Sequence, residues 1–232
     1  MGISYFEFVW DLEFGIYTMH MHIFFRMKTY ALDLLFPPFC VGCGSEGALL
    51  CPACDADVPV IPPSCFVCKK LVPARGTTVA GRTCAPCRKK SRVYAFFSPF
   101  SYDTPAIRSL IHGLKYHRRR DHAEILGNLL HRAIAYHGII LSRRAVFIPV
   151  PLHRARERVR GFNQSHLIAE QLGVTIGIPV LRGILLKTKN AAPQMELTRE
   201  KRLTNLDGAF AVSDAAAVRE KTVILVDDVK TS

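Results

Sequence analysis

Eight cysteines constrain this chain more than any other feature, because all of them fall between residues 40 and 87. They form four consecutive C-x-x-C pairs, and such spacing lets one tight turn direct both sulfurs at a single cation. Four thiolates complete a tetrahedral zinc site and leave no open position for chemistry. Sequential pairing predicts two structural zinc sites, with ligands Cys40, Cys43, Cys51 and Cys54 in the first and Cys65, Cys68, Cys84 and Cys87 in the second.

Disulfides and interleaved zinc sites are the alternatives to this arrangement. A small secreted domain would also be rich in cysteine, but the chain has no export signal and a large remainder without cysteine, which favours zinc. Which pairs share an ion stays open, since ribbons can interleave. Few apolar residues lie in this region, so the metal itself must hold the module together. A structural or docking role is favoured over direct contact with nucleic acid.

The first 26 residues are apolar but do not match a known targeting segment. Their longest stretch without Asp, Glu, Lys or Arg has 12 residues, whereas a membrane-spanning helix needs about 20. Acidic residues at positions 7 and 11 do not fit a secretory signal, so we expect a cytoplasmic protein with no membrane partner. Either Met27 is the natural start, or the leader is a packed N-terminal arm. We expect three parts: a leader of doubtful status at 1–29, a double zinc ribbon at 30–91, and an α/β domain at 92–232.

Strand and helix patterns alternate after residue 92, which predicts an α/β domain with a parallel sheet flanked by helices. The apolar run Thr222–Val226 is typical of a strand buried on both faces. Ligands of such sheets bind beyond the carboxyl ends of the strands, which directs attention to the residues after Val150 and Val226. The expected elements are strands at 94–102, 145–150 and 222–226, and helices from Pro105, over 123–137, and over 164–172 with an end at Gly173.

Basic residues gather on both sides of the strand that ends at Val150. The chain carries a net charge of +12, and residues 105–160 contain twelve Lys and Arg against three Asp and Glu. Such a cluster is either a solvated basic face or a polyphosphate site, since the planar guanidinium of arginine can bond two phosphate oxygens at once. The residues that follow Val150 are Pro151, Leu152, His153 and Arg154, and the alternating arginines continue through Arg156, Arg158 and Arg160.

Two acids, Asp227 and Asp228, follow the last predicted strand and are followed by Val229, Lys230, Thr231 and Ser232. Carboxylates here can accept hydrogen bonds from ribose hydroxyls or lie near Mg²⁺ through water, while loop N–H groups and hydroxyls hold a phosphate. Walker B strands show the same apolar run before an acid, but the chain has no genuine P-loop. The pattern therefore favours a sugar-phosphate site.

These motifs together resemble the ComF (ComFC-like) family, in which cysteine pairs precede a type I phosphoribosyltransferase domain. The run Val223–Ser232 is similar to the signature that binds phosphoribosyl pyrophosphate (PRPP) in these transferases. Further stretches agree, from Leu34 to Cys40, from Leu114 to Tyr116, from Pro149 through Arg160–Gln164, and from Gln194 to Phe210. The resemblance covers about residues 30–232.

The resemblance implies a phosphoribosyltransferase-like sheet, with catalysis at Asp227 and Asp228 and no protein nucleophile. Pro149–Arg154 would be the pyrophosphate loop and Thr188–Arg202 a mobile hood. Mg²⁺ and basic residues would stabilise the departing pyrophosphate while positive charge develops on the ribose. The residues implied in binding PRPP or pyrophosphate are Lys115, Pro151, Leu152, His153, Arg154, Arg158, Arg160, Arg199, Arg202, Val229, Lys230, Thr231 and Ser232.

Members of this family are associated with natural competence, DNA uptake and transformation; the sequence does not reveal an acceptor substrate. The family signature continues beyond the position where this chain stops, so we expect weak or lost PRPP binding. The alternative function is a non-catalytic competence factor that binds single-stranded DNA or a partner protein through its basic face and zinc ribbons.

Overall fold

The structure is a computed structural model that describes residues 37–74, 79–189 and 208–230. The chain divides after Asp55 into two compact units, residues 1–55 and 56–232. Several predicted features lie outside the described residues: the leader at 1–29, most of the hood, and the candidate ligands Arg199, Arg202, Thr231 and Ser232.

The first unit contains a zinc-ribbon knuckle. The amide of Cys40 donates to the Ser45 carbonyl (2.8 Å), and the amide of Gly44 donates back to the Cys40 carbonyl (2.8 Å). Gly44 has a φ of 77°, which favours glycine and lets the chain reverse tightly around the cysteines. The short helix α2 (Pro52–Ala56) begins directly after Cys51, the first cysteine of the second pair.

The second unit begins with another ribbon, which contains helix α3 (Ala85–Arg88). The predicted strand over residues 94–102 is wrong. In that segment, Ala95 forms an isolated bridge with Arg82, and the Phe96 amide donates to the Gly81 carbonyl (3.0 Å). The segment is therefore extended because it pairs locally with the ribbon, and within the described residues it joins no sheet.

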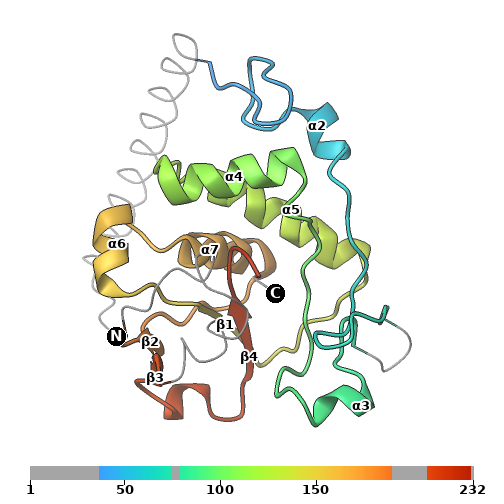
Figure 1. The fold of residues 1–232 in the computed structure, drawn as a ribbon, viewed down its shortest axis with the longest axis vertical. Helices are drawn as coiled ribbons and strands as arrows, with labels where there is room; N and C mark the ends of the chain where they lie inside the picture. The colour runs from blue at the N-terminus through green and yellow to red at the C-terminus, as the bar shows by residue number, and fades with distance from the viewer. Residues whose placement is uncertain (1–36, 75–78, 190–207, 231–232) are drawn as a thin grey trace, which may run out of the picture. The chain divides into compact units, whose positions relative to one another are not determined.

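Three helices form the body of the second unit: α4 (Pro105–Tyr116), α5 (His122–Tyr136) and α7 (Gln164–Ile176). The apolar side of α4 is buried, including Leu110 and Leu114, as its helical spacing predicts. The Asp121 carboxylate caps α5 by accepting from the His122 amide (3.1 Å). Helix α5 packs against both α4 and α7, and α7 packs on the sheet (Figure 1).

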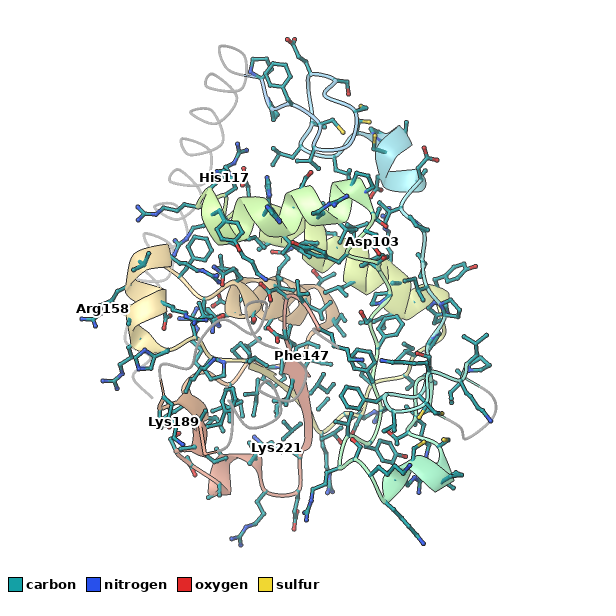
Figure 2. The ribbon with its side chains drawn as sticks, in the orientation of Figure 1. Asp103, His117, Phe147, Arg158, Lys189 and Lys221 are labelled. Carbon is teal, nitrogen blue, oxygen red and sulfur yellow. The ribbon has the colours of Figure 1, made fainter. Side chains whose placement is uncertain are left out.

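The sheet pairs β1 (Ala145–Pro149) with β4 (Thr222–Val226) in parallel, with Pro149 opposite Val226. On its other side β1 is bridged in parallel by Val180, which lies opposite Phe147. Every residue of β1 is buried, with α7 packed on the strand, and Phe147 lies in the middle of the packed side chains (Figure 2). The predicted fold class is confirmed: a cysteine-rich double ribbon precedes a phosphoribosyltransferase-like α/β domain with a parallel sheet and flanking helices.

The expectation that β4 is buried on both faces is wrong. Val223 is 42% exposed and Leu225 is 59% exposed, and only Val226 is buried. The physical reason is that side chains alternate between the two faces of a strand, so Val223 and Leu225 share one face of β4, and that face stays largely open in the described part of the chain. An apolar run alone does not reveal whether both faces of a strand are covered.

Helix α7 is longer than predicted, since it continues to Ile176 with Gly177 as its C-cap in a left-handed conformation (φ 77°). Gly173 therefore lies inside the helix and not at its end. A residue without a side chain is needed at this position because the chain returns closely past it. A Cβ atom there would lie 2.8 Å from the Ile178 carbonyl oxygen. The remaining elements are α6 (Arg154–Arg160), the antiparallel pair β2 (Leu185–Lys187) and β3 (Phe210–Val212), and the 3₁₀ turn η2 (Ala216–Val218).

None of the helices in the described part of the chain combines the length and the apolar character that crossing a membrane requires.

Candidate functional site

The eight cysteines converge in two groups of four, as the sequential pairing predicts. Within each group all four sulfurs lie within 4.8 Å of one another, and all eight thiols are free. The Cys43–Cys51 and Cys65–Cys84 sulfurs are both 3.7 Å apart. A tetrahedral site with zinc–sulfur bonds of about 2.3 Å places its sulfurs about 3.8 Å apart, far beyond the roughly 2.05 Å of a disulfide. The two tetrads thus form structural zinc sites, and neither disulfides nor interleaved pairing fits.

The charge distribution at the second site suits a divalent cation. Backbone N–H groups, first of Cys68 and then of Cys84, lower the pKa of the Cys65 thiol to about 6. The neighbouring Cys84 sulfur and then burial raise the pKa of Cys87 to about 12. Four converging thiols therefore cannot all ionise by themselves, and zinc would supply the positive charge that lets them do so.

The other site lies at the carboxyl edge of the sheet, where the loops after β1 and β4 meet. The parallel register ends with Pro149 opposite Val226, and the Val150 amide continues it by donating to the Val226 carbonyl (2.9 Å). Asn163, the N-cap of α7, donates from Nδ2 to the Val150 carbonyl (2.9 Å). The predicted pyrophosphate loop and the predicted acidic loop are therefore neighbours.

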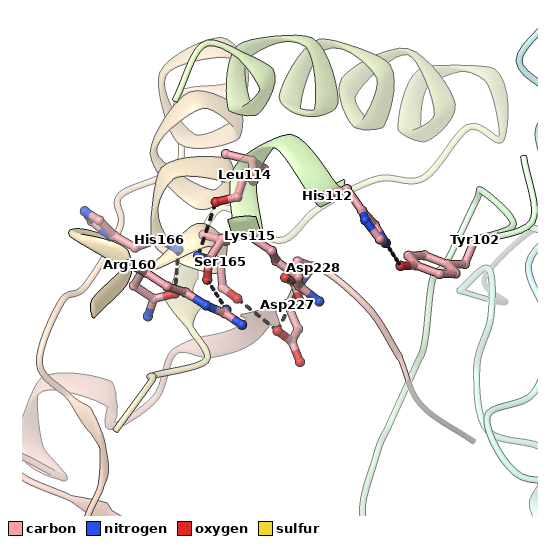
Figure 3. Close-up of polar contacts among 11 residues, drawn as sticks. Tyr102, His112, Leu114, Lys115, Arg160, Ser165, His166, Asp227 and Asp228 are labelled. Atoms are coloured by element: carbon pink, nitrogen blue, oxygen red, sulfur yellow. Dashed lines mark hydrogen bonds and ion pairs between the residues drawn. The ribbon is translucent and has the colours of Figure 1, made fainter. Parts of the chain in front are cut away.

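Asp228 forms an ion pair with Lys115 of α4, with 2.9 Å between Oδ2 and Nζ (Figure 3). The Lys115 side chain is 16% exposed and that of Asp228 12%, so the pair is largely shielded from solvent. Two residues that the sequence placed in the site, 113 positions apart, are thus in direct contact. The ion pair therefore places one positive and one negative side chain at the carboxyl edge of the sheet.

One carboxylate oxygen of Asp227 accepts two hydrogen bonds. The Ser165 hydroxyl and the Asp228 amide each donate to Oδ1 at 2.9 Å. Although part of the residue reaches solvent, its carboxylate lies among many protein atoms. This loss of solvation and then the charge of Asp228 raise the pKa of Asp227 to about 6, against the opposing effects of Ser165 and Lys115. Asp227 therefore gains or loses a proton close to neutral pH.

Lys187 of β2 adds a positive charge near this edge. Burial and then the charge of Arg156 lower the pKa of Lys187, whereas the charge of Asp227 raises it. The Lys187 ammonium also lies 5.6 Å from the centre of the Phe210 ring on the adjacent strand. Side chains from β2, α6 and the loop after β4 therefore interact electrostatically.

The predicted pyrophosphate loop runs into helix α6. Pro151 and Leu152 are half-buried, and His153 caps the helix by accepting from the Ala155 amide at Nδ1 (3.3 Å). Arg154, the first residue of α6, is exposed, and Arg158 points outward from the helix (Figure 2).

Arg160 has a different environment from the other predicted arginine ligands. It donates to Gln164 Oε1 (2.9 Å), and its guanidinium lies 5.9 Å from the centre of the Tyr116 ring. Gln164 in turn donates to the Leu114 carbonyl (3.5 Å). Arg160 therefore connects α6 to α4 and α7, which is a structural task beside its predicted contact with phosphate.

The loop after β4 continues through the half-buried Val229 to Lys230, whose side chain reaches the second zinc ribbon. The Lys230 ammonium lies 4.8 Å from the centre of the Phe66 ring and 5.0 Å from that of Phe96. Loss of solvation and then the ammonium of Lys69 lower the pKa of Lys230 to about 8.

Sequence reasoning missed Ser165 and Lys187. The signal for Ser165 was present, because it directly follows the Arg-Gly-Phe-Asn-Gln motif and lies on the first turn of the helix that the motif starts. Lys187 had no comparable signal, since a single lysine in a three-residue strand is not distinctive.

Comparisons with known proteins support the zinc ribbons and identify relatives of the chain. Residues 31–88 match the family described as "Double zinc ribbon domain". The "DNA utilization protein YhgH" of Salmonella typhi is 30% identical over 156 residues, which are 64% of this chain and 66% of that protein. Its counterpart in Escherichia coli K12 is 30% identical over 181 residues, 72% of this chain and 78% of that protein. The "Competence protein F" of Haemophilus influenzae is 39% identical over 88 residues, 37% of this chain and 38% of that protein.

The fold and the metal sites define a double zinc ribbon joined to a phosphoribosyltransferase-like α/β domain. The chain belongs to the ComF family. It spans just under two thirds of the length of the Salmonella relative. No solved structure matches it.

Proposed function

We propose that the carboxyl edge of β1 and β4 binds PRPP or a related phosphorylated ribose together with Mg²⁺, and that the chain serves in natural competence and DNA uptake. The observation that carries the first part is the pairing of Asp227 and Asp228 with the loop after β1 at one sheet edge. The second part is supported by the names of its relatives, "DNA utilization protein" and "Competence protein F".

A phosphorylated ribose presents two kinds of group, and this edge has partners for both. Ribose hydroxyls donate hydrogen bonds, which the carboxylates of Asp227 and Asp228 can accept. Phosphate oxygens accept hydrogen bonds, which Lys115 and Lys187 can donate. Since Lys115 is already held by Asp228 at 2.9 Å, the positive group is in place before any ligand arrives. Such preorganisation is what electrostatic recognition and catalysis require.

The reaction supported by this arrangement is displacement of pyrophosphate from the ribose by a nucleophilic atom of the acceptor substrate, which forms the new bond to the ribose carbon as the pyrophosphate leaves. As the bond between ribose and pyrophosphate breaks, positive charge develops on the sugar and negative charge on the leaving oxygens. Ionised Asp227 and Asp228 stabilise the sugar, while basic side chains stabilise the pyrophosphate. A bound Mg²⁺ would supply further positive charge at the pyrophosphate. Ser165 keeps the Asp227 carboxylate oriented by donating to it from one side.

Calorimetric titration of Mg²⁺–PRPP into the protein tests this proposal. We expect Asp227→Asn to weaken binding about 10- to 100-fold, because a hydrogen bond to a charged group contributes roughly 1.5–3 kcal/mol. Asp103→Asn is the matched control, since Asp103 is an exposed acid whose carboxylate accepts a 3.3 Å bond from the hydroxyl of Ser101. Equal affinity of the Asp227→Asn variant and the wild type would refute the assignment, as would equal weakening by the control.

A second candidate function, binding of single-stranded DNA, is favoured by one specific contact. Arg118, in the loop between α4 and α5, donates to the Val159 carbonyl of α6 (3.1 Å). This bond places the basic run Arg118–Arg120 beside the arginines of α6. Tyr116, which is 59% exposed, lies at the same surface and could stack on a base.

The two functions are separable by salt and by mutation. Binding of a strand through its phosphates weakens steeply as salt rises, because counterions are released. We expect Arg154→Gln together with Arg158→Gln to weaken DNA binding and to reduce its salt dependence, while Asp227→Asn leaves it unchanged. If the double arginine variant binds DNA as tightly as the wild type, this surface is not a nucleic-acid site.

A further inference from the structure

The loop after β4 is attached to the second zinc ribbon through one side chain. The Lys230 ammonium lies 4.8 Å from the Phe66 ring centre and 5.0 Å from the Phe96 ring centre. These two rings contact each other edge to face, with their centres 5.2 Å apart. The faces of aromatic rings attract cations, so the two rings bind the lysine ammonium. We call the Phe66 and Phe96 rings the aromatic seat of Lys230.

The position of the Phe66 ring is set by the zinc knuckle. Phe66 directly follows the ligand Cys65, and the knuckle is closed by the Cys65 amide, which donates to the Lys70 carbonyl (2.8 Å). The Lys69 amide donates back to the Cys65 carbonyl (3.0 Å), and Lys69 takes a φ of 63°, which ordinary residues adopt only in tight turns. Phe66 is therefore carried on a rigid, metal-centred turn.

The Phe96 ring is tied to the same ribbon by its backbone. The Phe96 amide donates to the Gly81 carbonyl (3.0 Å). Gly81 is required for this approach, because it has a φ of 69° and a Cβ atom there would lie 2.0 Å from the Phe96 carbonyl oxygen. Gly81 lies three residues before the zinc ligand Cys84. Both rings of the seat thus depend on the second zinc-bound segment.

The other end of the loop is fixed by the sheet domain. Asp228 is paired with Lys115, and Asp227 accepts from Ser165. Only Val229 separates Asp228 from Lys230, so the loop cannot shift at one end without moving the other. The aromatic seat and the acidic site are therefore mechanically connected within the second unit.

We propose that the second zinc ribbon positions the acidic loop of the sheet domain, with Phe66 and Phe96 holding Lys230 and thereby the backbone that carries Asp227 and Asp228. Lys230 is then a positioning residue, not a ligand of phosphate. The mechanical part of this proposal concerns the protein alone, whereas its effect on PRPP affinity rests on the proposed function.

Amide hydrogen exchange of residues 227–230 in the ligand-free, zinc-loaded protein tests the mechanical part. We expect Lys230→Gln and Phe66→Leu to speed exchange about five- to tenfold, as loss of one or two cation–π contacts implies. Lys230→Arg should restore protection, because a guanidinium also binds ring faces. Phe97→Leu is the matched control, since the Phe97 ring packs edge-on against His137, 5.7 Å between centres.

Each variant must retain two zinc ions, so that the exchange reports the seat and not collapse of the ribbon. Unchanged exchange in zinc-loaded Lys230→Gln and Phe66→Leu would overturn the proposal, and so would equal acceleration by Phe97→Leu. Mg²⁺–PRPP titration then separates the two ideas. If exchange changes as expected but Asp227→Asn binds like wild type, only the proposed function fails; if exchange is unchanged while Asp227→Asn loses binding, only the positioning role fails.

Discussion

Replacing Ser165 with alanine isolates one interaction at the acidic site. Ser165 is 4% exposed, and its hydroxyl is one of two donors to Asp227 Oδ1, the other being the Asp228 amide. The hydroxyl lowers the pKa of Asp227 against the larger, opposite effect of lost solvation, which raises it to about 6. Because alanine is smaller and apolar, the change removes the donor without adding a clash, and the pKa of Asp227 should rise.

The size of the rise follows from the hydrogen bond and from the exposure of its acceptor. A hydrogen bond to a charged group contributes roughly 1.5–3 kcal/mol when it is shielded. Asp227 is partly open to solvent, so water can replace the lost donor, and screening reduces the net loss to about 1 kcal/mol. One pKa unit corresponds to about 1.36 kcal/mol, so the pKa of Asp227 should rise by roughly 0.7.

The pH dependence of stability should shift in a defined direction. The folded state holds the Asp227 proton more tightly than the unfolded chain, whose aspartates have a pKa of about 3.9. The contribution of Asp227 to stability is therefore fully present below about pH 4 and is lost as the pH rises through about 6. In Ser165→Ala this loss should extend towards pH 7.

Carboxyl ¹³C NMR titration of Asp227 in both proteins measures the effect directly. Ser142→Ala is a suitable control, because the Ser142 hydroxyl accepts from the Arg144 amide (3.1 Å) in the turn before β1, at the opposite end of that strand. An unchanged or lower pKa of Asp227 in Ser165→Ala would show that the hydroxyl does not stabilise the ionised carboxylate.

Two further changes test the packing and the metal sites. Gly173→Ala should destabilise the protein by about 1–3 kcal/mol, although alanine normally stabilises a helix, because its Cβ would lie 2.7 Å from Val180 Cγ2; a urea midpoint at or above that of the wild type would contradict this. Cys68→Ser should lower the zinc content from two ions per chain to one, since the two tetrads share no ligand. Metal analysis showing two ions, or none, would argue against independent sites.

The ribbons were predictable from the sequence because their chemistry depends on spacing alone. A C-x-x-C pair brings two sulfurs to one cation whatever surrounds it, so zinc binding follows from the positions of the cysteines. Which pairs share an ion was left open by the sequence, and the structure groups them sequentially. Helix α4 was equally accessible, since Pro105 and the spacing of Leu110 and Leu114 are local signals.

Features that depend on contacts between distant parts of the chain could not be predicted from local sequence signals. The exposure of Leu225 reflects which elements pack on the faces of β4, and its apolar character does not reveal that. Gly173 looked like a helix end because glycine commonly terminates helices, but here it lets the chain return closely against α7.

The acidic site was predicted in part. Asp227, Asp228 and Lys115 were identified from motifs, and the structure brings all three to one edge. The partner of Asp227 was not identified, because Ser165 and Asp227 are 62 residues apart and only folding joins them.

The parallel register of β1 and β4 also determines how this fold tolerates change in chain length. The two loops of the acidic site are brought together by five paired positions, Ala145–Pro149 with Thr222–Val226, and not by the chain that connects them. The entropy of closing that connection grows only with the logarithm of its length, so each doubling costs about 0.6 kcal/mol. Insertions between β3 and β4, at the opposite end of β4 from the acidic loop, could therefore accumulate with little effect on the site, which leaves that segment free to diversify while the acidic edge stays the same.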